Sequence, residues 1–132
     1  MEDRNRFFSV TLILGDGALA AGVGKDIWLA QTKCELLEAE LSLRATGATS
    51  GNTDVDIKKN GALIWTTPGL RIVQGAAAPA AVRAKPTIGL SSLDLSGVPL
   101  DPGDSITADI VAVPGTASSG GFVRLLLRAR DV

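Results

Sequence analysis

The dipeptide Asn60-Gly61, between two short runs of strand-forming residues, is the feature that most restricts how this chain can fold. In the run before it, Val55 and Ile57 fall on one side of a strand, and the apolar run 62–66 follows directly. Asn and Gly both tolerate the positive φ angles of a type I′ turn. The segment therefore predicts a β-hairpin in which residues 62–66 return antiparallel to residues 53–59.

Regular alternation of apolar and polar residues predicts a longer strand before this hairpin. The odd positions from Leu37 to Ala45 are apolar, while the even positions between them are polar. This period of two indicates a strand of about twelve residues over 34–45 with one face buried. Residues 35–41 are also strong helix formers, so a helix is the alternative there. The alternation continues through Leu43, and we therefore prefer the strand.

Further strand-like runs are separated by turns rich in Gly, Pro and Ser. Residues 98–104 predict a rigid turn, after which Ile106, Ala108 and Ile110 are expected to form the inner face of a strand. About eight or nine strands, with turn signals roughly every ten residues, predict an all-β sandwich or barrel of Greek-key type. The other expected strands are 7–14, 26–30, 70–73, 88–95 and 123–130.

The length of 132 residues is sufficient for one core and too short for two. Residues 18–24 are small and contain Gly, which indicates a loop. We therefore expect residues 1–33 to form an N-terminal arm with short strands and residues 34–132 to form the sandwich. The alanine- and proline-rich stretch 74–81 predicts a long connection within it.

Composition limits the chemistry available to the chain. It has no His and no Tyr, which excludes a histidine general base, a Ser-His-Asp triad and the commonest metal ligand. Gly24-Lys25 lacks the other residues of a phosphate-binding loop, and a net charge of -1 leaves no basic excess for nucleic acid or anionic lipid. We therefore expect no enzyme activity, no catalytic residue, no cofactor, and neither a nucleic-acid nor a membrane partner.

Two aspartates on the hairpin raise the possibility of a metal site. Asp54 and Asp56 share one face of their strand and, with Asp104 or Asp109, have the oxygen ligands that a hard cation prefers. We prefer to interpret them as outward charges that discourage edge pairing and meet cationic side chains across strands. No metal site is therefore predicted.

Cys34 is the only cysteine, so no intrachain disulfide can form, and we expect it to be a small buried hydrophobe. No apolar run is long enough to cross a bilayer, and the acidic start Met1-Glu2-Asp3 is atypical of a signal peptide. The expectation is a protein made and folded in a cytoplasm.

Aromatic and cationic side chains supply the candidates for an interface. Three arginines on the outward face of the last strand, with Leu126 among them, suit either an acidic partner or a merely soluble surface. Indoles often contribute strongly to binding, and we expect one of the two to fill the core, with Trp65 placed in the core or at a subunit contact. The interface candidates are Phe7, Phe8, Trp28, Trp65, Arg124, Arg128 and Arg130.

Three sequence segments occur together in one order: VDIKKNG at 55–61, IWTT at 64–67 and LDPGDSITADI at 100–110. Together they resemble a jelly-roll module of tailed-phage virion proteins, in which a D-[IV]-x-K-N-G hairpin precedes a P-G-D-x-[IV]-T-x-D-[IV] strand and a closing apolar strand. The resemblance covers residues 34 to about 130. The Ala/Pro-rich insert at 74–87 and the strands before residue 34 depart from the pattern.

The resemblance implies a jelly-roll β-sandwich with an N-terminal extension. It also implies a structural role: a decoration or cement protein on the virion, at the capsid surface, with the major capsid protein and neighbouring copies of itself, as a homotrimer, as partners. The alternative within the same family is a receptor-binding, tail-fibre or baseplate module that recognises a host surface ligand. The small residues of the loops 46–52 and 115–121 favour the capsid role, because they offer no aromatic platform for sugars.

Overall fold

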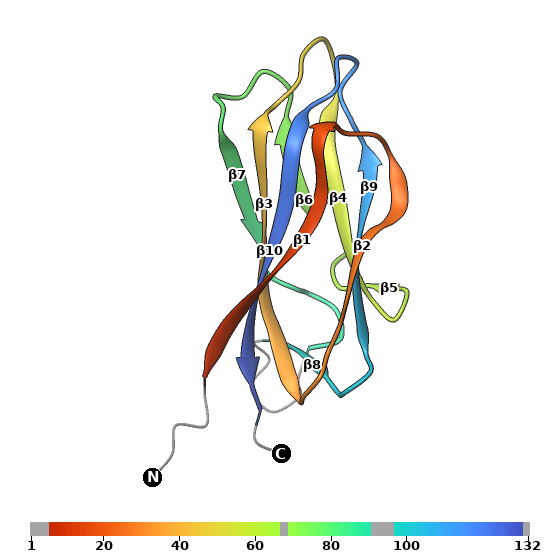
Figure 1. Ribbon diagram of the computed structural model, residues 1–132, viewed down its shortest axis with the longest axis vertical. Helices are drawn as coiled ribbons and strands as arrows, with labels where there is room; N and C mark the ends of the chain where they lie inside the picture. Colours follow the sequence, from red (N-terminus) through yellow and green to blue (C-terminus); the bar gives the residue numbers. More distant parts are fainter. Residues whose placement is uncertain (1–5, 67–68, 91–96, 131–132) are drawn as a thin grey trace.

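The computed structural model describes residues 6–66, 69–90 and 97–130, which form two antiparallel sheets packed face to face (Figure 1). The first sheet has the order β1-β10-β3-β7, with β8 also paired to β3. Its strands are β1 (Phe7–Ala18), β10 (Ser119–Ala129), β3 (Cys34–Ala45), β7 (Ala80–Ala84) and β8 (Val98–Leu100). The second has the order β2-β9-β4-β5, with β6 also paired to β4. Its strands are β2 (Gly22–Leu29), β9 (Ser105–Ala112), β4 (Asn52–Lys59), β5 (Ala62–Leu63) and β6 (Leu70–Val73).

The chain passes between the two sheets at six of the nine connections between its strands. Strands β1, β3 and β10 lie in the first sheet, while β2, β4 and β9 lie in the second, so strands far apart in sequence become neighbours. This double-sheet alternation is the arrangement of a jelly roll. The expected all-β sandwich is confirmed, and none of the described residues forms a helix that could span a membrane.

The core lies between the inner faces of the two sheets. Val55 and Ile57 are fully buried, as are Ile106 and Ala108 on the neighbouring strand, so both predicted inner faces are confirmed. The predicted strand over 34–45 is confirmed as β3, and its helix-forming composition is overridden by pairing with β10 and β7. The helix propensity of residues 35–41 does not decide their conformation, because their alternate apolar side chains can all be buried on one face only if the segment is a strand.

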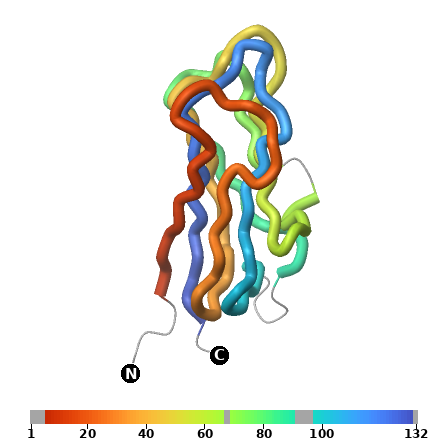
Figure 2. The backbone as a smooth tube through the Cα atoms, turned by 45° about the vertical axis from the view of Figure 1, so that its right-hand side comes forward, coloured from red at the N-terminus to blue at the C-terminus, as the bar shows by residue number. Residues whose placement is uncertain are grey.

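Residues 7–29 belong to the two sheets. Strand β1 pairs with β10 from Phe7 opposite Arg128 to Ala18 opposite Ser119, and β2 pairs with β9. Leu12 and Leu14 on β1 are buried in the common core. The short strands expected within residues 1–33 are therefore built into the same sandwich as the strands that follow (Figure 2).

The hairpin turn is confirmed, although its second arm is shorter than predicted. Asn60 and Gly61 have φ angles of 50° and 87°, and β5 contains two residues before the chain leaves the sheet to bury Ile64 and Trp65. The expected strand 88–95 lies partly outside the described residues, and residues 88–90 are not in a strand. Strand β7 instead forms at the end of the predicted connection, because backbone pairing with β3 does not depend on its small side chains.

Candidate interaction surface

Two of the three segments that carry the resemblance, residues 55–61 and 100–110, meet in the fold, and we call them the two motifs. The backbone N–H of Asn60 donates to the carbonyl of Ser105 at 2.9 Å, and the Ser105 N–H donates to Asn60 Oδ1 at 2.9 Å. Asn60 Nδ2 also donates to Asp104 Oδ1 at 3.0 Å. The N–H of Asp101 donates to the other oxygen of Asp104 at 2.8 Å, and these two bonds lower the pKa of the Asp104 carboxyl. The hairpin and the turn before β9 are thus held together by side chains.

A second contact between the motifs joins three strands of the second sheet. Lys58 Nζ on β4 lies 2.8 Å from Asp109 Oδ2 on β9, and the N–H of Gly24 on β2 donates to Asp109 Oδ1 at 2.6 Å. Burial of Asp109 opposes its charge, but the hydrogen bonds from Lys58 and Gly24 lower its pKa below the ordinary value. The described residues contain no cluster of metal ligands. Asp109 therefore serves to hold the sheet together.

Asp54 also forms an ion pair with a cationic side chain on a neighbouring strand. Arg71 Nε lies 2.7 Å from Asp54 Oδ1, between the neighbouring strands β6 and β4. The hydrogen bond that Arg71 donates to this carboxylate raises the pKa of Arg71. These contacts show that the motif residues stabilise the sandwich, so a binding surface is to be sought on the outer faces of the sheets.

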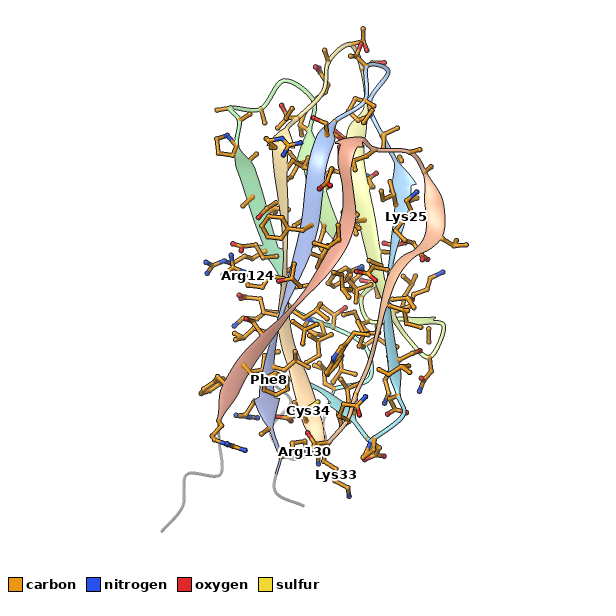
Figure 3. The ribbon with its side chains drawn as sticks, viewed as in Figure 1. Phe8, Lys25, Lys33, Cys34, Arg124 and Arg130 are labelled. Carbon is orange, nitrogen blue, oxygen red and sulfur yellow. The ribbon has the colours of Figure 1, made fainter. Side chains whose placement is uncertain are left out.

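Arginine and glutamate alternate across the outer face of the first sheet. Arg83 and Arg124 lie 3.0 Å and 3.6 Å from the carboxylate oxygens of Glu40, which stands between them on β3. Arg128 is bonded to the buried Glu35 two rows further along the sheet, beyond the pair Leu126 and Glu38. Figure 3 shows Arg124 pointing away from the sandwich. Two of the three predicted arginines are therefore neutralised by carboxylates, and they do not form a purely basic patch.

The third arginine lies apart from the other two. Arg130 is at the lower end of the sandwich, where its backbone N–H donates to the carbonyl of Lys33 at 2.9 Å (Figure 3). Arg130 follows the end of β10 and lies outside the rows of the first sheet. The structure therefore does not join the three predicted arginines into one surface.

The four predicted aromatic candidates have different surroundings. Trp65 is 3% exposed and belongs to the core, which settles the alternative left open by its sequence. Phe8 and Trp28 pack edge to face with ring centroids 6.4 Å apart and close the gap between β1 and β2. Phe7 is 61% exposed on the outer face of the first sheet. Of the predicted aromatics, Phe7 is the one available to a partner.

An apolar row along β2 was not among the predicted interface residues. Val23, Ile27 and Leu29 are 81%, 57% and 48% exposed, and we call them the β2 strip. The sequence shows a short strand at 26–30, but it does not say that these side chains face outward. The inner face of β2 is instead occupied by Asp26 and Trp28, which are only partly buried.

A shallow groove crosses the outer face of the first sheet, near the end of the sandwich that is far from Phe7 and Arg130. Its volume is about 500 Å³, and Ile13 and Phe122 supply large apolar side chains to its lining. Arg44, which bonds to the carbonyl of Asp16, closes one side. Arg44 and Asp16 are the charged residues of a lining that is otherwise small or apolar apart from Ser42, so the groove suits a mostly apolar ligand.

Comparison with solved structures finds a similarity to a phage capsid structure. The chain is similar to a solved structure described as "Capsid of Ralstonia phage GP4", with 20% sequence identity and a TM-score of 0.46 over 97% of this chain and 84% of that chain. No protein-family model and no curated protein matches the chain.

Proposed function

We propose that this chain is a structural virion protein of a tailed phage that decorates and cements the capsid by binding the lattice of the major capsid protein, and that it is not an enzyme. The sequence resemblance to the phage jelly-roll module supports this role. The two motifs of that resemblance are distant in sequence but bonded to each other in the fold through Asn60 and Asp104. They thus define one structural unit.

The observation that carries the proposal is the β2 strip. Val23, Ile27 and Leu29 expose large apolar side chains in a row along β2. Rows of this kind indicate contact with another protein. The repeating surface of a shell can hold many weakly bound copies, which together add stability by mass action.

The test is binding to capsids that lack this chain. We expect Ile27→Asp to weaken binding by about tenfold or more, because a charge would enter an apolar contact. Val73→Asp is the matched control: Val73 is 56% exposed on the same sheet but lies on β6. Equal loss in both variants would contradict the role of the β2 strip.

Copy counting by mass spectrometry of purified virions separates this role from its alternative. Hundreds of copies per particle are expected for a decoration protein. A handful would support a receptor-binding or fibre module instead, for which the groove beside Phe122 and Arg44 is the candidate ligand site.

A further inference from the structure

The first half of β1 has an open edge. The carbonyl of Arg6 accepts a hydrogen bond from Ala129 at the end of β10, whereas the N–H of Ile13 points away from β10 and donates to Asp26. Because backbone groups alternate in direction along a strand, the N–H and C=O groups of Phe7, Ser9 and Thr11 face away from β10. Residues 7–11 are uncharged and contain no Pro, so nothing in their composition discourages pairing.

The edges of the other outer strands are protected by recognisable devices. Strand β7 has five residues and is flanked by Pro79 and Lys85, while β5 and β6 are shorter still. On β2, Asp26 accepts from the N–H of Ile27 at 2.9 Å, and Gln31 donates to the carbonyl of Leu29 at 3.2 Å. Short strands, prolines and charges of this kind prevent edge pairing.

Asp26 also sets the limit of the open segment on β1. Its second carboxylate oxygen accepts from the N–H of Ile13 at 2.8 Å, so an incoming strand is blocked from that point onward. Below it, β1 continues beside β10 to the lower end of the molecule (Figures 1 and 2), with Phe7, Ser9 and Thr11 exposed. The accessible edge is therefore residues 7–11.

We propose that a second copy of this chain occupies this edge, with the two β1 strands antiparallel and a two-fold axis at Ser9. In this register Phe7 lies opposite Thr11 of the second copy, and Phe8 lies opposite Val10. Both are pairs of an aromatic with a β-branched residue, which stabilise antiparallel strands. Each pair of odd residues exchanges two backbone hydrogen bonds, and the small Ser9 fits at the axis.

Charge complementarity at the two ends of the paired segment favours a second copy as the occupant. Arg6 lies opposite Leu12 of the second copy. The next residue of that copy is Ile13, whose N–H donates to the carboxylate of Asp26 in the same copy. The pairing thus brings a guanidinium beside a carboxylate, and the two-fold axis repeats this contact. The product is a dimer, in contrast to the trimer expected from the resemblance. The pairing needs only the isolated chain and does not depend on the proposed role at the capsid.

The test uses the full chain and its mass in solution. Sedimentation equilibrium of the 13.6 kDa chain is expected to show a monomer–dimer equilibrium. Ser9→Lys places two like charges directly opposite each other and is expected to weaken the dimer by about tenfold or more. Ala81→Lys, on the exposed outer face of β7 at the opposite edge of the sheet, is the control and should leave the dimer unchanged.

Cysteine cross-linking tests the register. In the proposed pairing the two copies of Ser9 have Cα atoms about 5.5 Å apart, within the range that a disulfide spans. Ser9→Cys should therefore form a covalent dimer under mild oxidation, while Thr11→Cys should not, because its two copies are separated by four residues of strand. The native Cys34 is buried and does not compete. A chain that remains monomeric or forms only trimers, or equally fast cross-linking of the two variants, would overturn the proposal.

Discussion

Asn60 Nδ2 donates a hydrogen bond to Asp104 Oδ1 at 3.0 Å, which links the hairpin turn to the turn that precedes β9. The same Asn60 side chain accepts from the N–H of Ser105 at 2.9 Å. A residue chosen for its positive φ angle therefore also connects two motifs of the sequence. The residues that carry the resemblance therefore act in stabilising the fold.

Substitutions at residue 60 should separate these two roles. Asn60→Ala is expected to lower the free energy of unfolding by about 2 kcal/mol. The variant loses the side-chain hydrogen bonds of Asn60, and alanine tolerates the φ angle of 50° less well than asparagine does. Asn60→Gly relieves the backbone strain and should lose less. Urea denaturation measures both. If the two variants were equally stable, the backbone angle would be of no consequence here.

Stability should fall in acid because two aspartates have lowered pKa values. Asp104 is held below its ordinary 3.8 by the N–H of Asp101 and by Asn60. Asp109 is held low by Lys58 and Gly24 despite its burial. Their stabilising contribution is complete above the unfolded pKa and is lost as the pH falls through the lower folded pKa. We expect the free energy of unfolding to decrease as the pH falls below about 4.

The control for this pH dependence is Asp104→Asn, which removes one of the two titrating groups. Its stability should vary less with pH in the acid range than that of the wild-type protein. Denaturant titrations at a series of pH values provide the measurement. An unchanged slope in the variant would show that Asp104 does not contribute.

The thiol of Cys34 should be unreactive in the folded protein. Cys34 is 1% exposed, and burial raises the pKa of its thiol to about 11. The thiolate is the reactive form, so a thiol reagent at pH 8 should label the chain only after denaturation. An Ala81→Cys variant is a positive control, because Ala81 is exposed and its new thiol should react at once. Rapid labelling of the native wild-type chain would show that β3 opens locally at this position.

Gly69 should tolerate no side chain. A Cβ at this position would overlap the buried indole of Trp65. We expect Gly69→Ala to lower the free energy of unfolding by about 1–3 kcal/mol and to alter the fluorescence of the indole, since overpacking a core forces side chains to move. Gly17→Ala is the matched control: a Cβ there has no neighbouring atom within 4 Å, and stability should change little.

Much of the fold could be predicted from alternation alone. The buried positions of β3, β4 and β9 and the turn at Asn60-Gly61 depend on a period of two and on backbone angles that few residues adopt. Both are local properties. Strand β7 was missed because its residues are mostly alanine, which carries almost no strand signal, and its pairing with β3 decides its conformation.

The candidate surface could be predicted only in part. Phe7 was singled out and is exposed, but Trp65 is in the core and the β2 strip was overlooked. An alternating strand has two faces, and the sequence of β2 does not indicate which one meets the core. Asp26, which bonds to the edges of both sheets, was likewise unremarkable in sequence.

The sequence by itself determined that this chain is an all-β sandwich without a histidine and with one hairpin of known geometry, because these properties depend on neighbouring residues and composition. The tertiary structure alone decided that β1 joins β10 and that β2 joins β9, and therefore which edge is open and which face of β2 is exposed. Those outcomes depend on contacts between residues about a hundred positions apart, whose pairing is selected by burial of the whole core.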